Sequence, residues 1–292
     1  MASWFKEYKS SLKIIETEEL LDLAIYRPLG FILVKAVKHT DITPNQLTIA
    51  ALIAGLCSGF AFAQGTPSAF WVGSALYFIF NVLDCSDGQL ARLKHNGTPA
   101  GRIIDGMADY IAGIAVFIGL GIGYMNNYGN PYLWWLLLTS AVVSNIVHSI
   151  VTDNERLKYL RLVYGRRDAF SEELEEYRKE LARLKSQSGS PWFDRFVIQS
   201  YLYYMELAGW LDKRPEENVS PTTSENHKIV LRQFIKSWTF LGPTTHITIV
   251  VVATWFKRPD IAAWIILIPM NLYWLLLYLL QQYKLKHLTQ TI

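Results

Sequence analysis

Long apolar stretches separated by short polar segments dominate this chain. Six of the stretches hold about 20 residues or more, the length that a helix needs to cross the hydrocarbon core of a bilayer. They lie near Pro44–Ala63, Ser68–Arg92, Pro99–Tyr124, Pro131–Thr152, Ile229–Trp255 and Ile261–Tyr283. The pattern therefore predicts an all-α integral membrane protein with six transmembrane helices. A Gly242-Pro243 pair predicts a kink in the fifth helix, because proline lacks a backbone N–H.

The positions of these helices divide the chain into four parts. We expect residues 1–43 to form a cytoplasmic tail and an N-terminal amphipathic juxtamembrane helix. Residues 44–152 would hold transmembrane helices 1–4. Residues 153–228 would form a cytoplasmic helical insertion between helices 4 and 5, and residues 229–292 would hold helices 5–6 and a cytoplasmic tail.

The juxtamembrane helix is predicted from Glu16 to Lys38, where acidic and apolar residues alternate too closely for a membrane span. Such a helix lies on the membrane surface. We expect a break near Pro28-Leu29-Gly30, with Lys35 and Lys38 facing lipid phosphates. Residues 1–13 lack the apolar core and cleavage site of a signal peptide, so we expect no signal to be removed.

The insertion contains two further helical patterns. Ser171–Lys185 repeats apolar residues at helical spacing between charges, which predicts an amphipathic surface helix. Trp192–Trp210 is aromatic and apolar but too short to span, so we interpret it as an interfacial helix. Reading it as a seventh span would place Arg232 and Lys236 on the outer side. Asp212–Glu225 is rich in Pro, Ser, Thr and acidic residues and predicts a loop.

Charged residues make up only 18% of the chain, and their distribution predicts its orientation. Three short links join neighbouring helices on one side: Gln64–Thr66, Asn126–Asn130 and Lys257–Asp260. Of the 28 Lys and Arg residues, only Lys257 and Arg258 lie in these links. The positive-inside rule therefore places the opposite side, with both termini, in the cytoplasm. In a prokaryote the membrane would be the cytoplasmic (inner) membrane.

Four aspartates, Asp84, Asp87, Asp105 and Asp109, lie close together in the sequence within this apolar context. Asp84 and Asp87 are three residues apart and the other two are four apart, so each pair shares one face of a helix. Four converging carboxylates repel one another unless they are protonated or bind a cation, and Mg²⁺ or Mn²⁺ prefers such oxygen ligands. The alternative is that they are solvated helix ends or partners of arginines such as Arg92.

The spacing D-x2-D-G-x2-A-R-x8-G-x3-D-x3-D resembles the signature of the CDP-alcohol phosphotransferases, also called CDP-alcohol phosphatidyltransferases. The matching residues are Asp84, Asp87, Gly88, Ala91, Arg92, Gly101, Asp105 and Asp109. The resemblance implies transfer of a substituted phosphate from a CDP-linked alcohol to a hydroxyl acceptor, with release of CMP. It also implies two divalent ions, Mg²⁺ or Mn²⁺, and a homodimer.

The resemblance further implies roles for individual residues. Asp84, Asp87 and Asp105 would coordinate metal, while Asp109 would share in that coordination or stand free as the general base. The residues expected to contact the CDP part of the substrate are Gly88, Ala91, Arg92, Gly101, Asn45 and Thr48. Asn45 and Thr48 belong to a Pro-Asn-x-x-Thr segment whose alternative role is to begin the first transmembrane helix.

Three cations, Arg156, Arg232 and Lys236, are predicted at the cytoplasmic ends of helices 4 and 5. They would bind a phosphate carried by the acceptor, because Arg and Lys together suit such an anion. The alternative is that they anchor the helices at the lipid headgroups. His148 and His246 lie on the same two helices, and we expect them to form a hydrogen bond between helices rather than bind a ligand.

The predicted function is metal-dependent phospholipid-type biosynthesis. The donor would be a CDP-lipid such as CDP-diacylglycerol, and the acceptor a polyol phosphate such as inositol phosphate. Two alternatives stay open within this chemistry: a free alcohol acceptor, or a CDP-choline- or CDP-ethanolamine-type donor with a lipid acceptor. A carboxylate-lined ion or proton transporter is an alternative of another class, but it predicts acids near helix centres. A catalytically inactive scaffold is disfavoured by the complete signature. Membrane lipids are expected partners, and nucleic acid is not.

Overall fold

The structure is a computed structural model that describes residues 2–165, 169–186, 192–211 and 221–290, and these ranges are helical apart from short turns. Its α-helices are α1 (Ala2–Ser11), α2 (Arg27–Val37), α3 (Pro44–Ala63), α4 (Pro67–Lys94), α5 (Pro99–Tyr124), α6 (Pro131–Tyr164), α7 (Ala169–Ser186), α8 (Trp192–Leu211), α9 (Pro221–Thr239), α10 (Pro243–Trp255), α11 (Pro259–Leu267) and α12 (Pro269–Gln290). A 3₁₀ turn at Ile15–Thr17 and a π-helical turn at Asp22–Tyr26 lie between α1 and α2.

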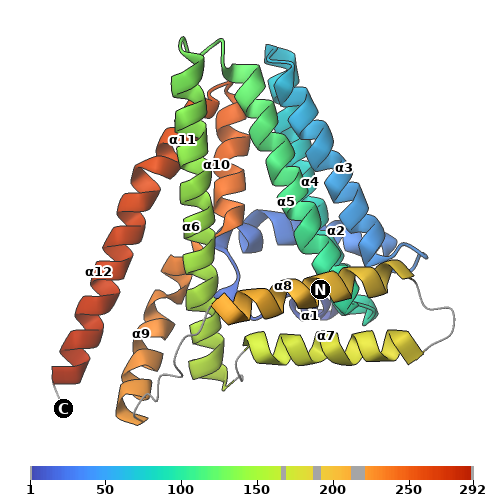
Figure 1. Ribbon diagram of the computed structural model, residues 1–292, viewed down its shortest axis with the longest axis vertical. Helices are drawn as coiled ribbons and strands as arrows, with labels where there is room; N and C mark the ends of the chain where they lie inside the picture. The colour runs from blue at the N-terminus through green and yellow to red at the C-terminus, as the bar shows by residue number, and fades with distance from the viewer. Residues whose placement is uncertain (1, 166–168, 187–191, 212–220, 291–292) are drawn as a thin grey trace.

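The long helices form a bundle that is narrow at one end and broad at the other (Figure 1). α3, α4, α5, α6 and α10 converge toward the narrow end, whereas α7 and α8 lie across the base and α9 and α12 spread to one side. In the described part of the chain, five segments are long and apolar enough to cross a membrane: α3, α4, α5, α6, and α11 with α12 taken as Pro259–Leu288. The expected all-α membrane protein is therefore confirmed.

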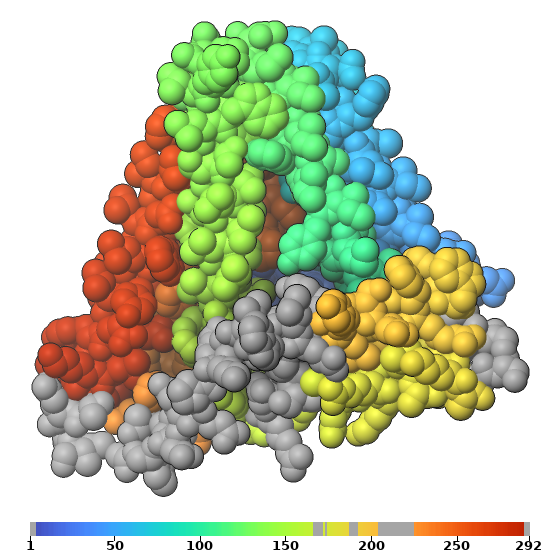
Figure 2. Space-filling model, viewed as in Figure 1, coloured from blue at the N-terminus to red at the C-terminus, as the bar shows by residue number. Residues whose placement is uncertain are grey.

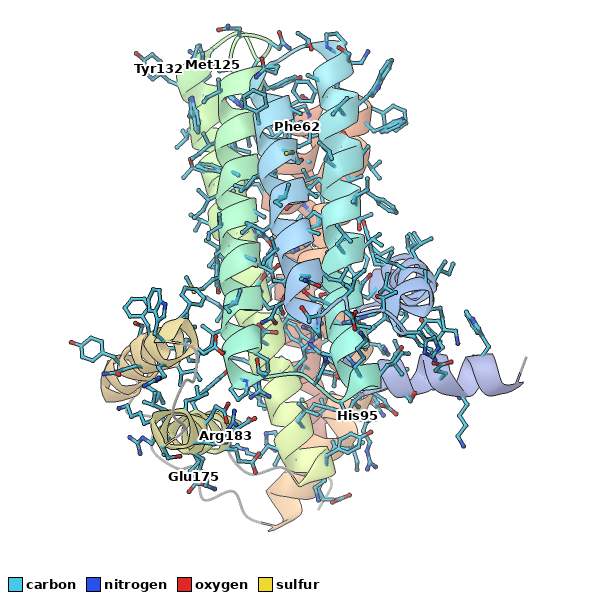
Figure 3. The ribbon with its side chains drawn as sticks, turned by 90° about the vertical axis from the view of Figure 1, so that its right-hand side faces the viewer. Phe62, His95, Met125, Tyr132, Glu175 and Arg183 are labelled. Atoms are coloured by element: carbon cyan, nitrogen blue, oxygen red, sulfur yellow. The ribbon has the colours of Figure 1, made fainter. Side chains whose placement is uncertain are left out.

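The two ends of the bundle differ in character (Figure 3). Phe62, Met125 and Tyr132 lie toward the end with the short links, and His95 lies at the other end together with Glu175 and Arg183 of α7. The turn between α4 and α5 thus lies at the same end of the molecule as the charged insertion.

The predicted fifth transmembrane helix is two helices. α9 ends at Thr239 and α10 begins at Pro243, so the expected kink is a complete break over residues 240–242. Pro243 occupies the first turn of α10, where its missing N–H costs nothing, but it cannot continue α9. α10 has 13 residues, which is too short for a bilayer core by itself. By length, the structure therefore supports five crossing segments rather than the six expected.

The N-terminal region also differs from expectation. The predicted break near Pro28–Gly30 is wrong, because the helix continues from Leu20 to Val37. A π-helical turn at Asp22–Tyr26 directly precedes Pro28 and widens the backbone where the proline ring would otherwise meet the preceding turn. Lys35 and Lys38 do not stand free toward lipid: both form ion pairs with Glu7 of α1.

The insertion is helical and packs on α5. α6 continues beyond the expected end at Thr152 to Tyr164, since no breaker occurs before Gly165, which adopts a left-handed conformation (φ +67°). An ion pair joins Arg102 of α5 to Glu176 of α7 (2.7 Å). The other residues that join α7 and α8 to α5 are apolar: Ala100, Ile103, Tyr177, Leu184, Val197, Ile198 and Leu202. Of the predicted loop, residues 212–220 lie outside the described residues, and α9 already begins at Pro221.

α3 and α5 are in backbone contact along a seam of small residues. A Cβ atom placed on Gly59 of α3 would lie 2.4 Å from the carbonyl oxygen of Ala115, and one on Gly119 of α5 would lie 2.1 Å from that of Gly59. Only glycine permits such an approach at either position. The seam fixes α5, which carries two of the signature aspartates, against α3.

Candidate active site

Three of the signature carboxylates converge at the broad end of the bundle. One oxygen each from Asp84, Asp87 and Asp105 lies within 4.8 Å of the other two, and we call these residues the acid group. α4 ends with His95 in a left-handed conformation (φ 52°), and Thr98 caps α5 by accepting a hydrogen bond from the Gly101 N–H (3.0 Å). This tight turn places the last turns of α4 opposite the first turns of α5.

The acid group fits a divalent cation. All three ligands are carboxylates, the donors that Mg²⁺ and Mn²⁺ prefer. Oδ1 of Asp105 is buried with no hydrogen-bond partner among the described residues, so it is available to a metal ion. Asp87 is buried, and its Oδ2 accepts a hydrogen bond from Thr48 Oγ1 (2.6 Å), which holds that carboxylate from the α3 side.

Asp109 is not a member of the acid group. It lies one turn further along α5, is exposed, and lines a cavity of about 490 Å³ together with Asp84. Figure 2 shows this cavity as a hollow between α5 and α6 on the face toward the viewer. We call it the lateral cleft, because it opens on the side of the bundle. Asp84 thus belongs to the acid group and also lies beside Asp109 in the cleft.

The lining of the lateral cleft changes along its length. Near Asp84 and Asp109 it includes Asn81, Asn145, Ser149 and Thr244. Toward the narrow end it is formed by apolar side chains of α5, α6, α10 and α11, which include Leu120, Leu138, Val250 and Ile266. A molecule with one polar and one apolar end therefore matches the lining of the cleft.

The small signature residues make room for neighbouring polar groups. A Cβ on Gly101 would lie 2.8 Å from Oδ1 of Asn45, so the absence of a side chain there admits the Asn45 amide. A Cβ on Gly88 would lie 3.4 Å from the Arg92 guanidinium. The structure therefore brings Asn45 to α5 and Thr48 to α4, as expected if α3 contributes to the site, while Ala91 is half-buried beside Arg92 on α4.

Arg92 is held by the N-terminus of the chain, which the sequence did not predict. Its Nε donates to the backbone oxygen of Ser11 (2.5 Å), and Gln89 Nε2 donates to the hydroxyl of the same serine (3.1 Å). The Nη2 atom of Arg92 is buried without a partner among the described residues. One amino group of this arginine thus remains available to an anion.

Residues 12–26, which we call the N-terminal segment, contact both α4 and α10. Arg27, at its end, is buried, forms an ion pair with Glu18 (3.2 Å) and donates to the backbone oxygen of Cys85 (3.3 Å). Asp22 accepts hydrogen bonds from Thr244 Oγ1 (3.0 Å) and the Cys85 thiol (3.5 Å). Burial raises the pKa of the Asp22 carboxyl. The only sequence signal for these contacts was the acidic run that we assigned to the membrane surface.

The three predicted acceptor-binding cations differ in their surroundings. Arg156 donates to Glu19 (3.3 Å) and Asp153 (3.2 Å), and Lys236 donates to the backbone oxygens of Ile15 and of Glu18 (3.0 Å). Arg232 is exposed. The N-terminal segment therefore binds both Arg156 and Lys236.

The predicted histidine contact is confirmed. His148 Nδ1 and His246 Nε2 lie 3.1 Å apart, and His246 Nδ1 lies 2.9 Å from the backbone oxygen of Gly242. Since a carbonyl oxygen can only accept, His246 Nδ1 carries a proton and its Nε2 accepts from His148. The pair joins α6 to α10 beside the lateral cleft.

A second cavity of about 870 Å³ lies between α3, α5 and α8. Its lining is mostly apolar and includes Ile49, Met107 and Phe196, with Gly106 on α5. We call it the α8 cavity. Thr48, which binds Asp87, also lines it.

Comparisons with known proteins agree with the signature. The family model described as CDP-alcohol phosphatidyltransferase matches residues 41–161. Over 124 residues the chain is 29% identical to a phosphatidylinositol phosphate synthase of Mycobacteroides abscessus, covering 41% of this chain and 50% of that protein. It is 29% identical over 117 residues to a protein of the same name from Cutibacterium acnes, covering 40% of this chain and 55% of that protein.

A third relative is a bifunctional IPC transferase and DIPP synthase of Thermococcus kodakarensis, 27% identical over 124 residues, which are 42% of this chain and 27% of that protein. The aligned part of this chain thus spans about half the length of the two synthases. The matched region contains α3, α4, α5 and most of α6, with all eight signature residues. Residues 41–161, which include every signature residue, are therefore similar to the CDP-alcohol phosphatidyltransferase family.

Proposed function

We propose that this protein transfers a substituted phosphate from a CDP-linked lipid to the hydroxyl group of an acceptor and releases CMP. The observation that carries the proposal is the acid group at the end of a cleft whose lining turns from polar to apolar. A nucleotide diphosphate next to the carboxylates and acyl chains along the cleft would match both parts of this lining. A transporter would need its carboxylates nearer the helix centres.

The lateral cleft favours a lipid donor such as CDP-diacylglycerol over a water-soluble donor. Acyl chains can enter it from the side, between α5 and α6, without leaving an apolar environment. The CDP group would then lie against Gly88, Ala91 and Gly101, with Asn45 and Thr48 approaching from α3. Arg92 would bind a phosphate oxygen through its unpartnered amino group.

The chain's own residues supply the remaining chemistry. Asp84, Asp87 and Asp105 would hold the divalent cations, of which we propose two, Mg²⁺ or Mn²⁺, with Asp109 completing the set or standing free. When bound, the metal supplies charge neutralisation for the pyrophosphate as its bond to CMP breaks. Asp109 faces the cleft and would take the proton of the acceptor hydroxyl. The acceptor oxygen then bonds to the phosphorus of the lipid phosphate, and CMP leaves with the electron pair of the broken P–O bond.

We propose a polyol phosphate, such as inositol phosphate, as the acceptor. The names of the two similar synthases support this choice. Arg156, Arg232 and Lys236 would bind its phosphate.

Further parts of the proposal are a homodimer, six membrane crossings in which α9 and α10 together form the fifth, and both termini and the acid group on the cytoplasmic side. The insertion would lie on that side too.

The test is release of CMP by the purified protein. It should release CMP from CDP-diacylglycerol only when Mg²⁺ or Mn²⁺ and a hydroxyl acceptor are both present. A panel of acceptors that includes inositol phosphate, inositol, glycerol phosphate and serine identifies the second substrate. Failure to release CMP with every acceptor, from a folded protein that binds the metal, would exclude the proposed reaction.

A further inference from the structure

Glu19 lies at the junction of the N-terminal segment with α6 and α10. It is buried, with 2% of its surface exposed. Its Oε1 accepts a hydrogen bond from Arg156 of α6 (3.3 Å), and its Oε2 accepts one from the backbone N–H of Thr245 in the first turn of α10 (3.2 Å). The contacts join residues separated by 137 and 226 positions in the chain.

The backbone around Glu19 is shaped to receive its carboxylate. Gly242, which precedes α10, offers no side chain to cap that helix, and a Cβ placed on it would lie 2.1 Å from Oε1 of Glu19. Glu19 therefore takes the place of the missing cap, and the glycine is what allows it to approach. A guanidinium and a helix N–H on one pair of oxygens form the same arrangement that binds a phosphate oxygen.

The charges around this carboxylate are mixed. Arg156 also binds Asp153 on α6, Asp22 lies on the N-terminal segment itself, and Lys236 of α9 binds backbone oxygens of the segment. The first turn of α10 carries no charged side chain. A phosphate approaching Arg156 would thus meet the carboxylate of Glu19 already in place, and like charges this close disfavour joint occupancy.

We propose that Glu19 is a specificity-determining residue whose carboxylate competes with the acceptor's phosphate for Arg156. Binding of a phosphorylated acceptor then requires Glu19 to leave the guanidinium. The inference rests on the proposed function, in which Arg156 binds that phosphate. Glu19 thereby sets how strongly a phosphorylated acceptor is favoured over an uncharged alcohol.

The first test compares the wild-type protein with Glu19→Gln. The amide keeps the size of the side chain and can still accept from Thr245, but it carries no charge to compete for Arg156. At pH 8.5 we expect the KM for inositol phosphate to fall about tenfold, the scale of one hydrogen bond to a charged group. The KM for CDP-diacylglycerol and for an uncharged acceptor should stay the same. An unchanged or raised KM for inositol phosphate would overturn the proposal.

The pH dependence offers a second readout. Burial, and then the nearby Asp22, raises the pKa of Glu19 to about 8. Glu19 therefore ionises as the pH rises through 8 and competes more strongly above that value. The ratio of the wild-type KM to the Glu19→Gln KM should increase between pH 7 and pH 9. A constant ratio of one across this range would contradict the competition.

Two further variants test whether Glu19 acts through Arg156. In an Arg156→Gln background, Glu19→Gln should no longer lower the KM for the acceptor. The guanidinium for which Glu19 and the acceptor phosphate compete is then absent. Glu7→Gln is the matched control: it removes another N-terminal carboxylate, one that binds Lys35 and Lys38 rather than Arg156. It should leave the acceptor KM unchanged. An equal effect of Glu19→Gln with and without Arg156 would mean that Glu19 acts elsewhere.

A binding measurement separates this inference from the proposed function. Inorganic phosphate stabilises the protein to which it binds and so raises the midpoint of thermal unfolding. The phosphate concentration that gives a stated rise should be about tenfold lower for Glu19→Gln than for the wild-type protein, whether or not CMP is released. If Glu19→Gln does not fold, Glu19→Asp withdraws the carboxylate from Arg156 and should show the same direction of change. Equal phosphate concentrations for the folded variant and the wild-type protein would reject the competition even if the proposed reaction is confirmed.

Discussion

The four signature aspartates have different surroundings, although the sequence spaces them regularly. Asp87 is buried and bound to Thr48, Asp105 has a buried oxygen without a partner among the described residues, and Asp109 is exposed in the lateral cleft. Asp84 belongs to the acid group and also lines the cleft. These differences favour metal coordination for the buried residues and proton transfer for the accessible one.

The hydrogen bond from Thr48 to Asp87 should contribute to metal affinity. Thr48→Val keeps the shape of the side chain but leaves the Asp87 carboxylate without its donor. We expect the Mn²⁺ concentration for half-maximal activity to rise about tenfold, the scale of a hydrogen bond to a charged group. Thr48→Ser, which keeps the hydroxyl, is the control and should stay near the wild-type value. A valine variant with unchanged metal dependence would show that this bond has no part in holding the metal.

Asp109 should matter for turnover more than for binding. In Asp109→Asn the side chain keeps its size but can no longer accept the proton of the acceptor hydroxyl. We expect kcat for CMP release to fall by about 100-fold or more, while binding of CDP-diacylglycerol changes by only several-fold. Asp84→Asn should instead weaken metal and nucleotide binding together. If Asp109→Asn retains more than about a tenth of the wild-type turnover, another group is the base.

At the scale of helices, α5 separates two cavities and bears a glycine in each. Gly113 lines the lateral cleft and Gly106 the α8 cavity, and a Cβ on either would meet no atom within 4 Å. A larger side chain at either position can therefore fill space without a clash at its first carbon. The two glycines form a matched pair that tests which cavity holds the donor.

Filling the lateral cleft should weaken donor binding. We expect Gly113→Leu to raise the KM for CDP-diacylglycerol about tenfold or more, because its side chain would occupy volume that the acyl chains need. Gly106→Leu should leave that KM near the wild-type value. The thermal unfolding midpoints of both variants show whether the fold is intact. The reverse result, with Gly106→Leu as the damaging change, would place the donor in the α8 cavity.

The sequence alone was sufficient to predict the helices whose formation depends on neighbouring residues in the chain. Apolar length predicted α3 and α5 with their ends, since Thr43 and Thr98 each begin a helix as N-caps before a proline. It predicted α4 as Ser68–Arg92, one residue late at the start and two residues short at the end. The Gly242-Pro243 pair predicted a kink. Whether a proline kinks a helix or breaks it into two depends on what stabilises the new helix ends. Here Glu19 caps the second helix from another part of the chain.

The acid group was equally predictable, because helical spacing and the tight turn at His95 determine which carboxylates meet. The N-terminal contacts were not. Glu19 reaches Thr245 across 226 residues, and Ser11 reaches Arg92 across 81, so no local pattern could reveal either bond. The acidic run was visible, but an acid that faces solvent and one that caps a distant helix look the same in a single sequence.

At the scale of the whole molecule, the two ends of the bundle are unlike. Short links with few charges close the narrow end, and the broad end carries the N-terminal segment, the acid group and the α7–α8 pair. In the proposed function, soluble substrates and CMP would therefore enter and leave at the broad end. This asymmetry agrees with the distribution of Lys and Arg along the sequence.

Site-directed labelling tests the orientation. In a protein with Cys57 and Cys85 replaced, a cysteine at Ser186 should react with a membrane-impermeant reagent only from the cytoplasmic side. One at Asn127 should react only from the outside, and one at Thr289 only from the cytoplasmic side. Reaction of the Ser186 and Thr289 positions from opposite sides would mean that an odd number of crossings separates them. Either Trp192–Trp210 would then span the membrane, or α9 and α10 would not together form a crossing.

The glycine seam between α3 and α5 has a mechanical consequence. The two helices are in backbone contact at Gly59 and Gly119 and cannot slide or separate without losing this contact. They therefore form a rigid pair. α6, which forms the opposite wall of the lateral cleft, has no such seam with α5 among the described residues. α6 is held to α5 near the narrow end by a side chain instead, because Trp134 donates to the backbone oxygens of Leu120 (3.2 Å) and Gly121 (3.1 Å). A lipid that passes between α5 and α6 would therefore have to enter nearer the broad end, where the lateral cleft lies.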